Sequence, residues 1–517
     1  MTKRSASCDI RTEAGVVRGR WRDGIGSFRG VPYASPPVGP RRFLPPERPP
    51  AWDGVRPTEE PGPAPMQPPS RAEVVMGPMD VPGYSEDCLT LNVWTPAPAS
   101  GAQLPVLVWL HGGGYMFGAG SASWYDGSVM ARRGGMVVVT VNYRLGALGY
   151  LYLPTSTGAG GPAANLGLQD QCMALEWVCD NIAAFGGDPA RVTVAGQSAG
   201  GLSVVALHAM PRASGLFQRA IVWSSGLQLP AHTLDEATAV TDVFLAAAGI
   251  PHDSVDALLD LPADRILEAQ EKTLLQAAVA VGGDPRLQPS SMAPFRPVVD
   301  GDVLPEDPVA AARRGAMDAG DLLIGVNAEE MGFVFAFDET FFEQDQLTVL
   351  AQVEATWGDE GLRVFESYTA REAGRTAPEV LCTLLSEEGA VPSIELAERR
   401  AAAGRPAYLA WFTWRSPAFG GRLGAAHTVE LPFVFNNPEN WTRSPMLAGA
   451  DDEEVHELGS ALQDAWIAFA ATGIPAEGWP PYVPPERAAM AFGRSVDVIS
   501  NPAPTRSATG LTFGTSA

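Results

Sequence analysis

The sequence of 517 residues carries little positive charge and few cysteines. Its 36 lysines and arginines stand against 59 aspartates and glutamates, which gives a formal net charge of −23 at pH 7. Because this balance repels phosphate groups and no basic run occurs, a nucleic-acid partner is not expected. The five cysteines are an odd number, and none forms a Cys-x-x-Cys pair. We therefore expect free thiols and a reducing, cytoplasmic location.

Long hydrophobic runs are also missing. Runs such as Val106–Leu110 and Met136–Val139 have only the length of a strand, whereas a membrane-spanning helix needs roughly 18 consecutive apolar residues. The first fifteen residues contain no apolar stretch of the kind that a secretory signal carries. Hydrophobic residues nevertheless make up 46% of the chain, which suffices for a large core and excludes global disorder. We expect an acidic, soluble globular protein without a membrane segment.

Short apolar strands alternate with helical patterns along much of the chain. The strand candidates from Leu89 onward are LTLNVW, LPVLVWL, MVVVTV, RVTVAG and RAIVW. Between Asn165 and Phe185, apolar residues recur at helical spacing. Strands interleaved with helices predict an α/β fold in which helices cover both faces of a mostly parallel sheet.

Two blocks rich in Ala, Leu and Glu interrupt this pattern. They cover roughly residues 231–318 and 336–405, and we predict that they form helical cap insertions. The proline-rich stretch 48–70 has the composition of a linker, but it lies between core-like segments. We interpret it as a surface loop inside one domain.

The strongest chemical signal is Gly196-Gln197-Ser198-Ala199-Gly200. A predicted strand runs into this motif and a predicted helix leaves it. A serine on such a strand–turn–helix forms a nucleophile elbow, in which the tight turn lifts the hydroxyl above the sheet and needs small flanking residues. The alternative is an ordinary serine at the start of a helix.

A second motif, His111-Gly112-Gly113-Gly114, ends another predicted strand. Ester hydrolysis passes through an oxyanion that backbone N–H groups must stabilise, and a glycine run lets the backbone approach that closely. We expect the donors to be the N–H groups of Gly113, Gly114 and Ala199. The alternative is a flexible glycine hinge. Two such motifs in this order favour acyl transfer.

Four longer segments carry a resemblance to a known family. They are residues 26–56, residues 85–94 (SEDCLTLNVW), residues 165–201 ending in the serine motif, and residues 465–482. Together they resemble the type-B carboxylesterases, a serine esterase family that also contains the cholinesterases. The resemblance covers nearly the whole chain. It implies one α/β-hydrolase domain over residues 8–512, a small-molecule ester substrate, and no metal or organic cofactor.

In an α/β-hydrolase the acid and the base follow the serine, in the order Ser, Asp or Glu, His. Ala-Glu-Glu-Met-Gly follows the predicted strand 321–327 and resembles the family's loop with the catalytic glutamate. Alignment on Gly-Val-Asn selects Glu330, with Glu329 as the alternative. Two of the six histidines, His427 and His456, follow the acid. His427 lies in a segment similar to the family's histidine motif, whereas His456 reads as an exposed helical position.

These assignments imply a serine hydrolase mechanism. His427 takes the proton of Ser198, whose hydroxyl oxygen attacks the ester carbonyl, while Glu330 orients the imidazole. Ser225 matches a family position that supports the triad, although it is also an ordinary strand-end serine.

Substrate preference rests on departures from the cholinesterase pattern. No tryptophan occurs between Gly54 and Val93 to hold a cationic head group, and Gln197 stands where the family commonly has glutamate. Both departures argue against quaternary amines. The acyl-pocket strip Ser290–Phe295 has small residues where cholinesterases are aromatic, so Phe295 borders a pocket predicted to be wide. We therefore predict broad, neutral substrates, bulky or aromatic ones included.

Other features of the resemblance concern the gorge and a missing disulfide. Tyr115 and Met116 are candidates for the gorge wall, or else for the core. Cys88 lacks the partner cysteine that is usual in the family, which agrees with a reducing compartment.

Two further functions stay open at this point. The same triad serves the hydrolysis of carbamates or amides, and the sequence does not separate these from esters. A non-catalytic binding protein of the cholinesterase type is the more distant alternative, because such relatives lose the nucleophile that is present here. The sequence makes no prediction of oligomeric state.

Overall fold

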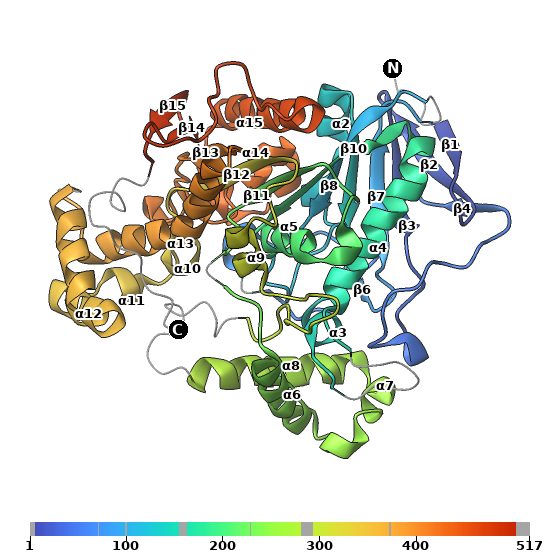
Figure 1. The fold of residues 1–517 in the computed structure, drawn as a ribbon, viewed down its shortest axis with the longest axis horizontal. Coiled ribbons are helices and arrows are strands. Elements are labelled where there is room, and N and C mark those ends of the chain that lie inside the picture. The colour runs from blue at the N-terminus through green and yellow to red at the C-terminus, as the bar shows by residue number, and fades with distance from the viewer. Residues whose placement is uncertain are drawn as a thin grey trace.

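Most strands of the chain join one mixed sheet (Figure 1). The computed structural model describes residues 6–502 except 71, 99–100, 155–162, 228, 281–292 and 372–373. In spatial order the strands are β1 (Ala6–Arg11), β2 (Val16–Arg22), β3 (Ile25–Pro32), β7 (Thr90–Thr95), β9 (Val137–Val141), β8 (Leu104–Leu110), β10 (Gly187–Gln197), β11 (Arg219–Trp223), β12 (Asp321–Asn327), β13 (Tyr408–Phe412), β14 (Ala488–Phe492) and β15 (Val496–Ser500), and β4 (Val55–Pro57) pairs with β2.

The middle of this sheet is parallel. From β9 across to β14 every neighbouring pair of strands runs in the same direction, whereas the pairs at both ends are antiparallel, apart from β4 on β2. The central strands are continuous apolar runs because helices cover them on both faces. In β8, for example, Pro105 to Leu110 are all buried.

Alternate residues of one strand enter two separate cores. In β8, Val106 and Val108 belong to the core that also contains residues of α4 and α5, whereas Leu107 and Trp109 belong to the core with α14 and α15. This alternation follows from the two-residue period of a strand. The sheet is therefore the middle of three layers. Figure 1 shows α4 and α5 in front of it.

The described chain forms these α-helices: α1 (Glu73–Met76), α2 (Ser128–Gly134), α3 (Gly146–Tyr150), α4 (Leu166–Asn181), α5 (Ala199–Ala209), α6 (Leu234–Ala248), α7 (Ala257–Asp260), α8 (Ala263–Ala280), α9 (Pro308–Arg314), α10 (Gly332–Phe335), α11 (Glu339–Phe342), α12 (Gln346–Arg371), α13 (Ala377–Ala402), α14 (Leu431–Phe435) and α15 (Asp452–Thr472). A short separate pair, β5 (Ala64–Pro65) and β6 (Tyr84–Ser85), brackets the loop with α1.

The two inserted helical blocks are heterogeneous. In the first block α6 packs on α8, away from the sheet, whereas α9 packs on α5. In the second block α12 packs on α13, and α13 also contacts β12 and α9. The blocks therefore combine projecting helices with helices of the layer that covers the sheet.

The parallel strands bring several chain segments to one edge of the sheet. The loops after β8, β10, β12 and β13 all leave at the carboxyl edge, which is where α/β sheets place their ligand sites. No helix in the described part of the chain is both long and apolar enough to cross a membrane. All five cysteines are free thiols, and Cys88 is buried.

Candidate functional site

Ser198 stands on the sharp turn between β10 and α5. Its φ of 56° and ψ of −127° form a backbone conformation that residues other than glycine rarely adopt. The Ser198 N–H donates to the carbonyl of Trp223 at the end of β11, at 2.9 Å. A Cβ on Gly200 would lie 2.1 Å from the Leu110 carbonyl oxygen. The turn is therefore packed against β8 and needs glycine there, as the elbow predicts.

Glu330 and His427 meet after β12 and β13. His427 Nδ1 lies 2.6 Å from Glu330 Oε2, and the His427 N–H donates to the Glu330 carbonyl at 3.2 Å. The other carboxylate oxygen, Oε1, accepts from Ser224 Oγ at 2.5 Å and from the Asn327 N–H at 2.9 Å. Both oxygens of this carboxylate are thus hydrogen-bonded, and the side chain is fixed toward the imidazole.

Glu329, the alternative acid, points to a different set of partners. Its Oε2 accepts from the Ala425 N–H at 2.9 Å. Its Oε1 is ion-paired with Arg415 and lies 3.8 Å from Arg375. Of the two neighbouring glutamates, Glu330 contacts the histidine, and Glu329 holds the backbone just before it.

The electrostatics keep His427 basic. Burial lowers the pKa of His427, but the charge of Glu330 and its hydrogen bond, together with the charge of Glu430, outweigh burial and raise it above the ordinary value. Glu430 is fully buried and accepts from Asn327 Nδ2 at 2.5 Å. Burial and the charge of Glu330 raise the pKa of Glu430 to about 7.

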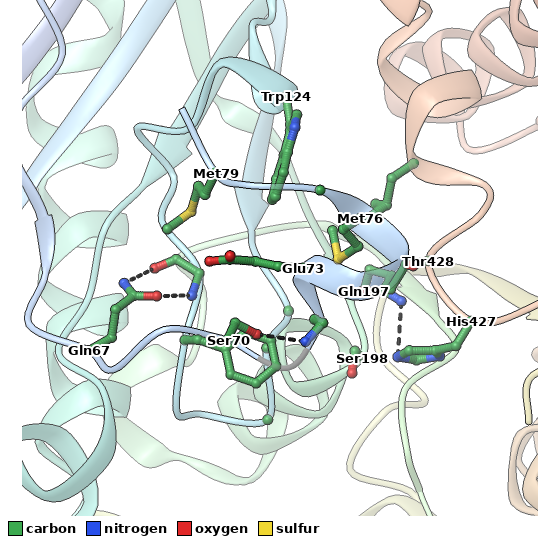
Figure 2. A pocket seen from close by; sticks show the side chains of 18 of the residues that line it. Gln67, Ser70, Glu73, Met76, Met79, Trp124, Gln197, Ser198, His427 and Thr428 are labelled. Carbon is green, nitrogen blue, oxygen red and sulfur yellow. Dashed lines mark hydrogen bonds between the residues drawn. The ribbon is translucent and has the colours of Figure 1, made fainter. Parts of the chain in front are cut away.

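Gln197 contacts the opposite side of the imidazole. Its Nε2 lies 3.2 Å from His427 Nε2, and Figure 2 shows this contact next to Ser198. An amide donor on Nε2 requires the tautomer with the proton on Nδ1, which is also the tautomer that donates to Glu330. Both contacts therefore favour a neutral imidazole with Nε2 as the acceptor.

The glycine loop after β8 borders the same space as Ser198 and His427. Gly113 and Gly114 have φ values of 117° and 60°, and a Cβ on Gly113 would lie 1.9 Å from the Phe117 carbonyl oxygen. Within the described part of the chain, neither N–H donates a hydrogen bond. Ala199 is the first residue of α5, where an N–H has no partner inside the helix.

His111 is a structural part of this loop. Its Nδ1 lies 2.8 Å from the Gly112 carbonyl, and its ring stacks on Tyr143 with 4.3 Å between centroids. Burial lowers the pKa of His111 to about 4, so the ring is neutral. His456, on α15, is exposed and is not among the residues that line the same space as Ser198 and His427.

An open cavity at this edge of the sheet has two distinct walls. The catalytic wall comprises Gly112–Gly114, Gln197, Ser198 and His427. Facing it, the α1 wall comprises residues of the loop 67–79, namely Gln67, Pro68, Ser70, Ala72, Glu73, Met76, Gly77 and Met79. Between the two lie mainly apolar side chains: Phe117, Trp124, Phe333 and Leu431. Among the described residues, no group of three metal-ligating side chains suits a metal ion.

The predicted gorge residues lie elsewhere. Tyr115, Met116 and Phe295 are buried in the core and do not line the cavity. The Tyr115 ring packs on Tyr150 at 4.7 Å, and the Phe295 ring packs on Phe244 at 5.9 Å. The physical reason is that the backbone after the glycines turns inward, so Tyr115 is the core residue that the sequence left as an alternative. Ser290–Met292 of the acyl-pocket strip fall outside the described residues.

The supporting serine is also displaced by one position. Ser225 Oγ is buried without a hydrogen-bond partner in the described structure, whereas Ser224 donates to Glu330. Ser224 has a φ of 44° and follows the last residue of β11, so the chain turns there, and it is Ser224 rather than Ser225 that faces the acid. The two serines are adjacent in Trp-Ser-Ser-Gly, so the sequence pattern alone could not show which of them contacts Glu330.

The α1 wall was missed because its residues follow a proline-rich stretch that reads as surface loop. That loop is anchored at Gln67, whose amide donates to the Pro65 and Gly118 carbonyls at 3.0 and 2.9 Å and accepts from the Gly118 N–H at 2.8 Å. A glutamine flanked by prolines was the one local signal of such an anchor.

Comparison with known proteins gives one consistent result. A model of the "Carboxylesterase family" matches residues 6–508. A phenmedipham hydrolase of Pseudarthrobacter oxydans is 36% identical over 93% of this chain and 94% of its own length. A para-nitrobenzyl esterase of Bacillus subtilis is 35% identical over 95% and 96%. A solved carboxylesterase of Geobacillus stearothermophilus, 36% identical, superimposes with a TM-score of 0.82 over 97% of this chain and 99% of its own. The likeness to solved carboxylesterases confirms the predicted α/β-hydrolase fold.

Proposed function

Since this chain belongs to the carboxylesterase family and is a carboxylic ester hydrolase, we propose that Ser198, Glu330 and His427 are its catalytic triad. The observation that carries the proposal is the 2.6 Å contact of His427 Nδ1 with Glu330, in a cavity that Ser198 also lines. Serine, histidine and a carboxylate in this arrangement make an alcohol nucleophilic at neutral pH.

The reaction proceeds in two halves. His427 Nε2 accepts the Ser198 proton as the serine oxygen attacks the ester carbonyl, and Glu330 stabilises the imidazolium that forms. The imidazolium then protonates the alcohol, which leaves an acyl-enzyme. Water repeats the sequence and releases the acid. Gln197 must release His427 Nε2 when Ser198 donates, because that lone pair accepts one hydrogen bond in this tautomer.

The oxyanion of each tetrahedral intermediate is assigned to the N–H groups of Gly113, Gly114 and Ala199. In support, the N–H groups of Gly113 and Gly114 donate to no group in the described chain. Both glycines line the same cavity as Ser198, and Ala199 follows Ser198 directly in the chain. One such donor contributes on the order of 100-fold to the rate.

The substrates we propose are esters of broad structure, neutral and bulky or aromatic ones included. The support is that Trp124, Phe117 and Phe333 line the open cavity beside Ser198, because aromatic side chains offer large apolar contact areas to aromatic ligands. Free thiols at all five cysteines support a reducing, cytoplasmic location.

Carbamate hydrolysis is the second candidate activity. It is favoured by the phenmedipham hydrolase, which is 36% identical along nearly its whole length. A carbamate carbonyl needs the same nucleophile and oxyanion donors as an ester, so one site serves both.

The test is hydrolysis of p-nitrophenyl acetate, butyrate, octanoate and benzoate by the wild-type protein and by Ser198→Ala. We expect wild-type activity on all four and a loss on the order of 10⁴-fold or more in kcat for the variant. Ser254→Ala, at an exposed serine, is the matched control and should retain full activity. Activity that survives in Ser198→Ala would refute the assignment of the nucleophile. Phenyl methylcarbamate, assayed beside these esters, measures the second activity.

A further inference from the structure

Glu73 places a carboxylate inside the cavity, opposite the catalytic wall. It is the first residue of α1, and its backbone is fixed because its N–H donates to the Ser70 carbonyl at 3.1 Å and its carbonyl accepts from Gly77 at 2.9 Å. Figure 2 shows its side chain extending from α1 toward the side of the cavity where Met79 and Gln67 lie. No sequence pattern indicated a charged group at this place.

This carboxylate has no cationic partner in the described structure. It takes part in no ion pair or side-chain hydrogen bond there, and no lysine or arginine is among the described residues that line the cavity. The nearby amide of Gln67 is already engaged with Pro65 and Gly118 through both its nitrogen and its oxygen. Within the described part of the chain, the Glu73 carboxylate therefore faces the cavity without a charged side-chain partner.

One aromatic side chain that lines the same cavity as Glu73, Trp124, is held by its neighbours. Trp124 stacks on Trp441 with 4.9 Å between centroids and 10° between planes, and its carbonyl accepts from Asn437 at 3.0 Å. Tyr84 also lines the cavity. Burial, and next the charge of Glu73, raise the pKa of Tyr84. Aromatic faces attract cations as well as apolar groups.

The charge of Glu73 determines which ligand groups can bind at this end of the cavity with the smallest desolvation penalty. A bulky substrate displaces water from Glu73, and a neutral or anionic group there leaves the carboxylate without the hydrogen bonds that water supplied. A protonated amine replaces them with a charge-assisted hydrogen bond. Quaternary ammonium groups lack the N–H donors for such a bond.

We propose that Glu73 extends the substrates of this enzyme to esters that carry a protonated amine, and makes it discriminate against esters that carry a carboxylate. The inference rests on the proposed function, because it concerns the same cavity. Neutral esters remain substrates, and the amine end of a charged ester lies against Glu73 while its carbonyl lies at Ser198.

The test compares substrates that differ in charge at one position. For the acyl side these are methyl 4-(aminomethyl)benzoate, methyl 4-ethylbenzoate and monomethyl terephthalate, which are cationic, neutral and anionic. For the alcohol side, 2-(dimethylamino)ethyl benzoate is compared with the uncharged 3-methylbutyl benzoate. We expect kcat/KM for the cation to exceed that for the neutral ester by about fivefold on at least one side, and the ratio to fall with added salt.

Glu73→Gln should bring the ratio of kcat/KM between the cationic and the neutral esters close to one, and should improve hydrolysis of monomethyl terephthalate relative to methyl 4-ethylbenzoate. Glu73→Asp keeps the charge and should retain part of the preference. Glu366→Gln, the same change at an exposed position on α12, is the control and should alter no ratio.

An unchanged ratio in Glu73→Gln, with neutral esters still hydrolysed, would overturn this inference alone. Failure of the wild-type protein to hydrolyse the neutral esters would instead overturn the proposed function, and this inference with it.

Discussion

The catalytic wall and the α1 wall face one cavity but are built in different ways. On the catalytic wall, Ser198, Glu330 and His427 follow central strands of a parallel sheet, and each is fixed by hydrogen bonds to neighbouring strands or loops. The α1 wall is one turn of helix in a long loop, anchored at Gln67. The chemistry thus depends on the sheet, whereas the fit of the substrate depends on a loop that packs across it.

This difference predicts that substitutions on the catalytic wall lower kcat for every substrate, whereas those on the α1 wall change the preference among substrates. Pairs of neighbouring or chemically similar residues give the sharpest tests.

The largest difference should separate two adjacent glutamates. Glu330→Gln replaces the acceptor on His427 Nδ1 with an amide that favours the wrong tautomer, and we expect kcat to fall by about 10³- to 10⁴-fold. Glu329→Gln keeps a hydrogen-bond acceptor for Ala425 and should cost less than about tenfold. Both are measured with p-nitrophenyl butyrate at saturation.

The pH profile gives the Glu330→Gln test a second readout. The charge and hydrogen bond of Glu330 counteract burial and raise the pKa of His427, so their removal lowers that pKa. Since only the neutral imidazole accepts the serine proton, the acidic limb of the residual activity should move to lower pH. A shift to higher pH, or equal losses of kcat in the two variants, would contradict the assignment of Glu330.

A smaller difference should separate two adjacent serines. Ser224→Ala removes the 2.5 Å hydrogen bond to Glu330 Oε1, while the Asn327 N–H stays in place. We expect kcat to fall by about tenfold. Ser225→Ala removes a hydroxyl with no partner in the described structure and should leave kcat within about twofold. A larger loss of kcat in Ser225→Ala than in Ser224→Ala would show that Ser225 supports the acid.

The smallest effect is expected on the α1 wall. Met79→Ala removes apolar contact area from the cavity and should raise KM for p-nitrophenyl octanoate about threefold, with kcat for the acetate unchanged. Leu347→Ala, which truncates a side chain that is 78% exposed on α12, is the matched control. A fall in kcat for the acetate in Met79→Ala would show that the α1 wall also supports the catalytic groups.

Local patterns were enough to predict most of the framework. The apolar runs of β8, β9, β10 and β12 lie where the sequence predicted strands, because buried parallel strands must be apolar on both faces. The candidate triad residues also came from local motifs, and the structure brings them to one edge of the sheet. The side chains around the triad could not be predicted in this way, since Ser224 and Ser225 are equivalent in sequence, and Tyr115 adjoins the glycine loop yet points into the core.

The sequence by itself determined the fold family and the residue types for acyl transfer, because a tight glycine turn, an apolar strand and the chain order of the motifs are local properties. The tertiary structure decided which of two neighbouring glutamates meets the histidine, which of two serines supports the acid, and that a carboxylate from a proline-rich loop faces the cavity. Each of these depends on contacts between residues far apart in the chain, and such contacts form only when the strands and loops have packed together.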